Sequence, residues 1–134
     1  MKIAVAGVGY VGLVTAVTLA DVGYDVICLD VDKGKLKMLK EGISPIYEYG
    51  LEELMLKNRE RLEFTDDVTK YSEAQVIIIG VGTPEKEDGS ADLSAVFSVV
   101  DSIADNCSDG TVVVVKSTVP IGTCESVRRR IDER

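Results

Sequence analysis

Three glycines near the amino terminus, in GVGYVG at residues 7–12, form the first pattern in the chain that is typical of ligand binding. This stretch fits the pattern G-x-G-x-x-G, which by itself is weak evidence because short glycine patterns arise by chance. Gly7 would permit a tight turn, Gly9 would let the backbone approach a pyrophosphate, and Gly12 would let a following helix pack closely. The amino terminus of that helix would present free N–H groups to an anion. The pattern therefore predicts a phosphate-binding turn.

An acidic residue, Asp30, follows at the end of the next predicted strand, residues 25–29. A carboxylate at this position would accept hydrogen bonds from the adenosine ribose hydroxyls and would repel a 2′-phosphate, which favours NAD over NADP. A purely structural interpretation stays open, in which Asp30 ends the strand or caps a helix that begins at Asp32. Together, the glycine turn and this acid predict a dinucleotide site.

Two further strand ends carry polar residues, GVGTP at 80–84 and KSTVP at 116–120. Ligands of open α/β sheets bind beyond the carboxyl ends of the strands, so we expect both loops at the same edge as the glycine turn. Thr83 and Thr118 could donate hydrogen bonds on the nicotinamide side of a dinucleotide, although Thr83 could equally be a simple turn residue. Ser117 is expected only to satisfy nearby backbone groups.

Strands and helices alternate along the chain around these residues. Strands are predicted at 2–6, 25–29, 62–65, 76–81 and 111–115. Helices are predicted at 10–22, 32–40, 51–61, 93–106 and 122–134. The alternation predicts an α/β fold of the Rossmann type, a doubly wound, mostly parallel sheet with helices on both faces.

Composition narrows the class of protein. The chain has 134 residues, about one domain, and its net charge of −8 opposes a role in nucleic-acid binding. The three cysteines show no paired spacing and there is no histidine, which favours reduced thiols in the cytoplasm and predicts no metal site. The basic run 128–130 is expected to be a solvated helix face. The uncharged stretch 3–20 is long enough for a membrane segment, but glycines interrupt it and acidic residues follow closely, so no membrane segment is expected.

Taken together, these motifs make the sequence resemble the UDP-glucose/GDP-mannose dehydrogenase family. The resemblance runs along the whole chain, through MKIAVAGVGYVGL, DVDKGK at 30–35, GISPIYEYGLEEL at 42–54, VGTP with DGSADLSAV, and KSTVPIGT at 116–123. KSTVP is closer to the UDP-glucose branch than to the UDP-N-acetylmannosamine branch. Tyr49 departs from the family pattern, which has proline there, and this leaves the shape of its loop open.

The resemblance implies a known chemistry. Family members oxidise the C6 hydroxyl of a nucleotide sugar to a carboxylate with two NAD+ in succession, and the branch resembled here converts UDP-glucose to UDP-glucuronate. A cysteine holds the intermediates as a thiohemiacetal and a thioester. The cofactor contacts that the resemblance implies come from Gly7, Gly9, Tyr10, Val11, Gly12, Asp30, Lys35, Val81, Gly82, Thr83 and Thr118. Thr118 would also help to position water or substrate.

The resemblance also implies that residues 1–134 are the NAD-binding domain, truncated before the family's central helix and sugar-nucleotide domain. The missing part would carry the catalytic cysteine, because the surroundings of Cys124 do not resemble the family's nucleophile loop. The fragment is then expected to be inactive, and the full-length protein to be a cytoplasmic homodimer that binds UDP-glucose mainly through the missing domain. Three alternatives stay open: a dehydrogenase for GDP-mannose or UDP-N-acetylmannosamine, a non-catalytic NAD-sensing module, and a structural domain with a degenerate glycine turn.

Overall fold

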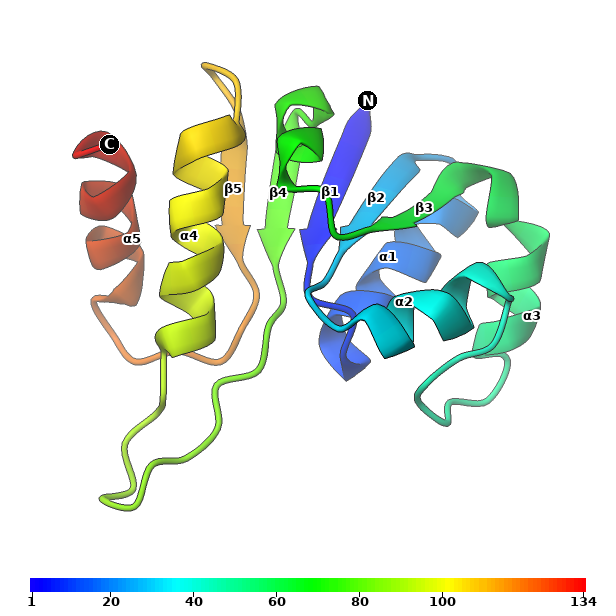
Figure 1. The fold of residues 1–134 in the computed structure, drawn as a ribbon, viewed down its shortest axis with the longest axis horizontal. Helices are drawn as coiled ribbons and strands as arrows, with labels where there is room; N and C mark the ends of the chain where they lie inside the picture. The colour runs from blue at the N-terminus through cyan, green and yellow to red at the C-terminus, as the bar shows by residue number, and fades with distance from the viewer.

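A computed structural model describes all 134 residues and contains one five-stranded sheet in the order β3-β2-β1-β4-β5. The strands are β1 (Lys2–Ala6), β2 (Asp25–Leu29), β3 (Leu62–Thr65), β4 (Val76–Ile79) and β5 (Val112–Val115). All neighbours are parallel, and Ala6 lies opposite both Leu29 and Ile79, so the carboxyl ends of the central strands are level. This carboxyl edge of the sheet is where the 80–93 and 116–122 loops leave it (Figure 1).

Helices cover both faces of the sheet, which confirms the predicted doubly wound fold. They are α1 (Tyr10–Val22), α2 (Lys33–Lys40), α3 (Leu51–Lys57), α4 (Ser94–Asn106) and α5 (Thr123–Asp132), with two 3-10 turns, η1 (Arg59–Arg61) and η2 (Val68–Glu73). The strand order changes direction between β1 and β4, because the chain crosses from β3 at one edge back to β4 beside β1. In sheets of this kind the ligand lies outside that point.

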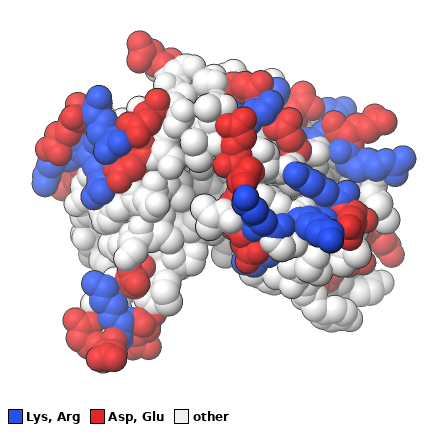
Figure 2. Space-filling view, viewed as in Figure 1, with Lys and Arg blue, Asp and Glu red and all other residues white.

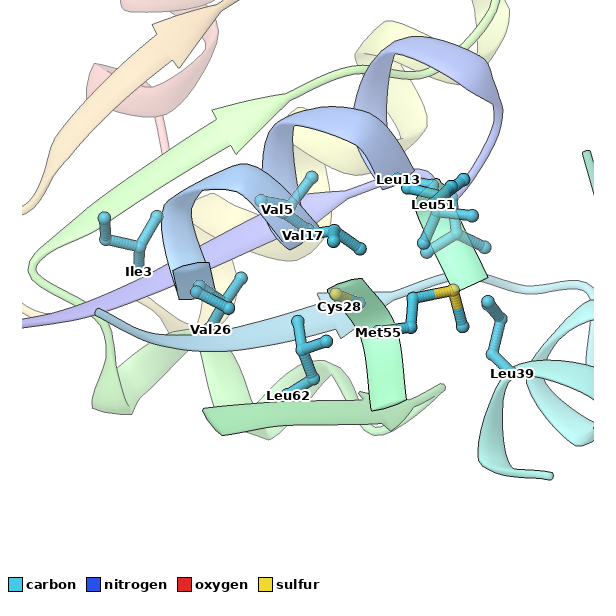
Figure 3. Packing of buried hydrophobic residues seen from close by; sticks show 13 residues of the cluster. Ile3, Val5, Leu13, Val17, Val26, Cys28, Leu39, Leu51, Met55 and Leu62 are labelled. Carbon is cyan, nitrogen blue, oxygen red and sulfur yellow. The ribbon is translucent and has the colours of Figure 1, made fainter. Parts of the chain in front are cut away.

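The side chains of β1 alternate between two separate cores, as the pleat of a strand requires. Ile3 and Val5 pack with α1, α2 and α3 in one core, which Figure 3 shows from close by. Ala4 and Ala6 face the other core, with η2, α4 and α5. A strand buried on both faces explains why the β1 sequence is continuously apolar after Lys2.

Three local elements differ from the sequence prediction. The strand expected at 76–81 ends at Ile79, so Gly80 and Val81 belong to the loop that follows it. The prediction of one continuous helix at 51–61 is wrong, because α3 ends at Lys57 and a 3-10 turn follows. Asn58 separates the two: its buried side-chain amide donates to the Leu54 carbonyl (2.9 Å) and to Asp21 Oδ1 (3.0 Å), a competition with helical bonding that is typical of asparagine. The turn η2 was not predicted, and Asp67 caps it by accepting a hydrogen bond from the Thr69 N–H (3.0 Å).

The basic run on α5 is exposed, as predicted, and one of its members also contacts a neighbouring helix. Arg128 is exposed, but Arg130 donates to both carboxylate oxygens of Asp101 on α4, at 2.7 and 2.9 Å. Arg134 makes the same paired contact with Asp105, at 2.8 and 2.6 Å. These two pairs hold α5 against α4.

None of the helices combines the length and the hydropathy that a membrane crossing requires. The uncharged stretch 3–20 is divided between β1 and α1, with the glycine turn between them.

Candidate functional site

The glycine turn lies at the carboxyl edge between β1 and α1, and two of its glycines are required by packing inside the chain. Gly7 has φ +99°, and a Cβ there would lie 2.8 Å from the Val81 side chain. A Cβ on Gly12 would lie 1.8 Å from the Gly7 carbonyl oxygen. Since only glycine fits both positions, the first turn of α1 can cross directly over the end of β1.

Gly9 has a different environment. It is the N-cap residue of α1 with an ordinary φ of −72°, and a Cβ there would meet nothing within 4 Å. No side chain caps the helix, and the N–H groups of Tyr10 and Val11 donate to no other group of the chain. The first turn of α1 also carries no acidic residue. Open space beside free N–H groups at a helix amino terminus is suited to an anion.

Asp30 stands directly after β2 and is joined to the glycine turn. Its Oδ2 accepts a hydrogen bond from the Val8 N–H at 2.9 Å, and its Oδ1 accepts one from the Asp32 N–H at 2.8 Å. Each carboxylate oxygen has a second lone pair, so both can still accept a bond from an external hydroxyl. The structural and the ligand-binding interpretations of Asp30 are therefore compatible, and it is Asp32 that caps α2.

A cavity of about 170 Å³ opens beside Asp30, between the end of β2, η2 and α4. Its lining is mostly apolar and includes Leu29, Val31, Tyr71, Val81, Ala95 and Val99. Burial and the nearby Asp30 carboxylate raise the pKa of Tyr71, so its hydroxyl keeps its proton. Apart from Val81, these lining residues were missed by sequence reasoning, because η2 carries no recognisable pattern and the α4 residues looked like ordinary core.

The two polar loops predicted at the carboxyl edge are brought together and joined by hydrogen bonds. Thr83 Oγ1 donates to the Thr118 carbonyl at 2.7 Å. Ser117 Oγ donates to the Val81 carbonyl at 2.7 Å. Because the Thr83 proton is used within the chain, its oxygen is left as an acceptor. Gly82 is open, since a Cβ there would meet nothing within 4 Å.

Tyr10 lies in the first turn of α1 and extends towards the 42–50 loop. Its hydroxyl donates to Glu48 Oε2 at 2.6 Å, and this bond raises the pKa of Tyr10. The loop around Tyr49 is thereby fastened to the glycine turn, although Tyr49 itself is 95% exposed. Val11 is partly exposed beside Tyr10, in agreement with an open site.

Helix α2 is a local positive region in an acidic protein. Its four lysines are Lys33, Lys35, Lys37 and Lys40. None of them forms an ion pair within the chain. Figure 2 shows basic side chains gathered over this part of the molecule. Helix α2 starts three residues after Asp30, so its lysines add positive charge close to that residue in the chain.

The chain has no group of three or more His, Cys, Asp or Glu side chains that could hold a metal ion. Cys28 is buried in β2, where burial raises its pKa, and Cys124 is exposed in the first turn of α5.

Comparison with known proteins agrees with this geometry. Residues 1–134 match the NAD-binding domain of the UDP-glucose/GDP-mannose dehydrogenase family. A UDP-glucose 6-dehydrogenase of Rhizobium meliloti is 50% identical over 137 residues, covering 99% of this chain and 31% of the relative. The chain therefore spans about a third of the length of the curated relatives it matches.

Solved structures give the same result in three dimensions. A GDP-mannose dehydrogenase from Pseudomonas aeruginosa is 38% identical with a TM-score of 0.93, over 99% of this chain and 32% of that one. A UDP-D-ManNAc dehydrogenase from Pyrococcus horikoshii is 33% identical with a TM-score of 0.95, over the same shares. Proteins that act on different nucleotide sugars thus share this fold closely.

Proposed function

Because this chain belongs to the UDP-glucose/GDP-mannose dehydrogenase family and is its NAD-binding domain, we propose that it holds NAD along the carboxyl edge and, in the full-length protein, serves the oxidation of UDP-glucose to UDP-glucuronate. The observation that carries the binding site is the position of Asp30, which lies between the uncapped amino terminus of α1 and the apolar cavity. An adenosine diphosphate needs these three features side by side.

The residues present fit this cofactor. The open space at Gly9 admits a pyrophosphate to the free N–H groups of Tyr10 and Val11. The Asp30 carboxylate accepts from the ribose hydroxyls, and Lys35, half-buried on α2, lies on the same side. The cavity takes the flat, largely apolar adenine ring.

The nicotinamide half would then extend over the 81–83 and 117–118 loops. Thr83 and Thr118 are held together there by the hydrogen bond from Thr83 Oγ1 to the Thr118 carbonyl. This bond leaves the Thr118 hydroxyl available to orient water or substrate. NAD+ bound in this way would accept a hydride from the substrate alcohol.

Sequence identity supports UDP-glucose as the sugar nucleotide, since two curated UDP-glucose 6-dehydrogenases are 50% and 47% identical to this chain. Among solved structures the identities do not separate the sugars: a UDP-glucose dehydrogenase from Pyrobaculum islandicum is 37% identical, and the relatives named for GDP-mannose and UDP-D-ManNAc are 38% and 33% identical. The TM-scores of the last two, 0.93 and 0.95, indicate that the fold of this domain does not choose the sugar. We therefore assign that choice to regions outside residues 1–134. The residues described here are proposed to bind NAD without turning over substrate, and the full-length enzyme is proposed to be a homodimer.

Calorimetric titration of the chain with NAD+ and with AMP tests the binding site. Both are expected to bind, and Asp30→Ala should weaken both by about 10- to 100-fold, because hydrogen bonds to a charged group contribute roughly 1.5–3 kcal/mol. Asp109→Ala is the matched control, since that exposed carboxylate lies in the turn before β5, at the opposite edge of the sheet. Heats of zero with both ligands would exclude the site.

A second experiment tests the sugar nucleotide. The full-length protein is assayed for NAD+ reduction with UDP-glucose, GDP-mannose and UDP-N-acetylmannosamine, and UDP-glucose is expected to give the highest kcat/KM. A higher value with either of the others would replace UDP-glucose while leaving the NAD site intact. Sedimentation of the same preparation shows whether it is a dimer.

A further inference from the structure

We propose that Ser117 is a positioning residue. Acting through Val81, it fixes the loops on the nicotinamide side of the dinucleotide site relative to the glycine turn and Asp30. The proposal rests on the proposed function, since it assumes that NAD spans both halves. Ser117 is 9% exposed, and its hydroxyl donates to backbone carbonyls at and just after the end of β4. Its hydroxyl is one of the few buried polar groups of the chain.

Ser117 extends the pairing of β4 with β5 beyond the ends of both strands. The regular register stops at Ile79 opposite Val115. Past that point, the N–H groups of Lys116 and Ser117 both donate to the Ile79 carbonyl, at 2.8 and 3.0 Å. The Ser117 hydroxyl then reaches two residues further, to the Val81 carbonyl at 2.7 Å. It thereby fixes the position of the loop after β4, where no backbone ladder is available.

Val81 also packs so closely against the glycine turn that no further atom fits between them. The Cβ that Gly7 lacks would lie 2.8 Å from the Val81 Cγ1 and 3.0 Å from its Cα. One residue earlier, the missing Cβ of Gly80 would lie 3.1 Å from the Cα of Gly12. A shift of the 80–81 backbone would therefore push on the turn that receives the pyrophosphate, because close-packed backbone segments cannot deform independently.

A second bond crosses the same gap in the opposite direction, from Thr83 Oγ1 to the Thr118 carbonyl. The loops after β4 and β5 are thus joined twice, once on each side of the Ser117–Thr118 peptide. If the Ser117 hydroxyl is removed, the Val81 carbonyl loses a buried partner. Beyond the Ile79 carbonyl, the hydrogen bond from Thr83 Oγ1 to the Thr118 carbonyl is then the one that still joins the two loops. The nicotinamide side would then move relative to the glycine turn, whereas Asp30 would keep its place beside Val8.

The test compares ligands that need one half of the site with ligands that need both. Ser117→Ala is titrated with AMP, NAD+ and NADH by calorimetry, and NADH fluorescence is recorded at saturation as a report on the nicotinamide environment. Affinity for NAD+ should fall about five- to tenfold, as expected from one buried hydrogen bond. AMP affinity should fall by less than NAD+ affinity, because Val81 lines the cavity but Asp30 keeps its bond to the Val8 N–H. The NADH emission should change. Ser117→Cys, which keeps the size and a weak donor, should fall between Ser117→Ala and the wild type.

Ser126→Ala on α5 is the matched control, because that exposed hydroxyl bonds only to the Gly122 carbonyl at the start of its own helix, at 3.3 Å. NAD+ affinity within twofold of the wild type in Ser117→Ala would overturn the proposal. So would an equal loss of AMP and NAD+ binding, which would indicate general structural support. If the wild type bound neither ligand, the proposed function itself would fail, an outcome that the wild-type titration separates from the others.

Discussion

A Cβ atom on Gly12 would lie 1.8 Å from the Gly7 carbonyl oxygen, whereas a Cβ on Gly9 would meet nothing within 4 Å. At the residue scale, one glycine pattern therefore combines two physical requirements. Gly7 and Gly12 are needed for the chain to pack against itself. Gly9 is needed only if something outside the chain comes close, and that makes it the sharpest single-residue probe of the site.

Gly9→Ala is expected to abolish measurable NAD+ binding while leaving the free energy of unfolding within about 0.5 kcal/mol of the wild type, as for an unhindered surface change. Its φ of −72° suits alanine, so no backbone strain arises. Urea unfolding and calorimetric titration of the same preparation measure the two quantities. Gly12→Ala is the contrasting variant and should lose stability as well as binding. Normal NAD+ affinity in Gly9→Ala would show that no ligand approaches this atom.

Asp30 is also expected to decide between NAD and NADP. Its carboxylate would face a 2′-phosphate, while the lysines of α2 have no partner within the chain. In Asp30→Ser the ratio of the NADP+ to the NAD+ dissociation constant should fall by about tenfold or more, because a like-charge repulsion is removed. Calorimetry with both cofactors measures it, with Asp109→Ser as control. An unchanged ratio would place the discrimination elsewhere.

At the scale of elements, α5 contributes Val127 and part of Ile131 to the second core and adds polar contacts with α4. Only Thr123 and Val127 of this helix are buried. Arg130 binds both oxygens of Asp101, and its guanidinium also lies 5.2 Å from the centre of the Phe97 ring. The helix that follows the KSTVP loop thus combines core packing with directional contacts to α4.

Arg130→Ala should lower the urea midpoint of unfolding, whereas Arg128→Ala should leave it nearly unchanged. Arg128 is the matched control because it lies on the same helix and its contact, 3.8 Å to Asp132, is highly exposed. Circular dichroism during urea titration measures both variants. Equal midpoints for Arg130→Ala and the wild type would mean that the paired contact contributes nothing.

The same contact predicts a pH dependence. The hydrogen bond from Arg130 lowers the pKa of Asp101, and that from Arg134 lowers the pKa of Asp105. A carboxyl whose folded pKa is below its ordinary value of 3.8 contributes stability above that value and loses it as pH falls through the folded pKa. The difference in the free energy of unfolding between wild type and Arg130→Ala should therefore be largest at pH 7 and become smaller below about pH 4. A difference that stays constant down to pH 3 would contradict this assignment.

At the scale of the whole molecule, one face of β5 is covered by helices and the other face is exposed. Val113 and Val115 pack with the core beneath α4 and α5. Val112 and Val114 point the other way and are 56% and 40% exposed. As β5 is also an edge strand, its apolar outer face and free backbone groups favour association with another chain.

Val114→Thr should reduce concentration-dependent self-association while changing stability by less than about 0.5 kcal/mol. Val113→Thr, one residue away on the half-buried face that packs with the core, should cost more, about 1 kcal/mol, because it partly buries a hydroxyl. Analytical ultracentrifugation measures the first quantity and urea unfolding the second. A similar loss of stability in both variants would show that the two faces of β5 are equally covered.

Sequence patterns predicted best those features that depend only on residues close together in the chain. The glycine turn, the strand ending at Asp30 and the alternation of strands and helices were all readable in this way. Asn58 was not, because its effect on α3 depends on a contact with Asp21 on another helix. The same holds for Tyr71, which acquires a role only because η2 brings it to the cavity beside Asp30.

Periodicity and glycine chemistry act over short distances, so the sequence was enough to predict the five strands, most of the helices and the three polar strand ends at one edge. Only the tertiary structure decided how those ends are joined. The strand order places β4 beside β1, so Val81 meets Gly7 and Ser117 reaches Val81. Asp30 likewise holds Val8 across the end of β2. These contacts join residues far apart in the chain, and their geometry follows from packing that no local pattern records.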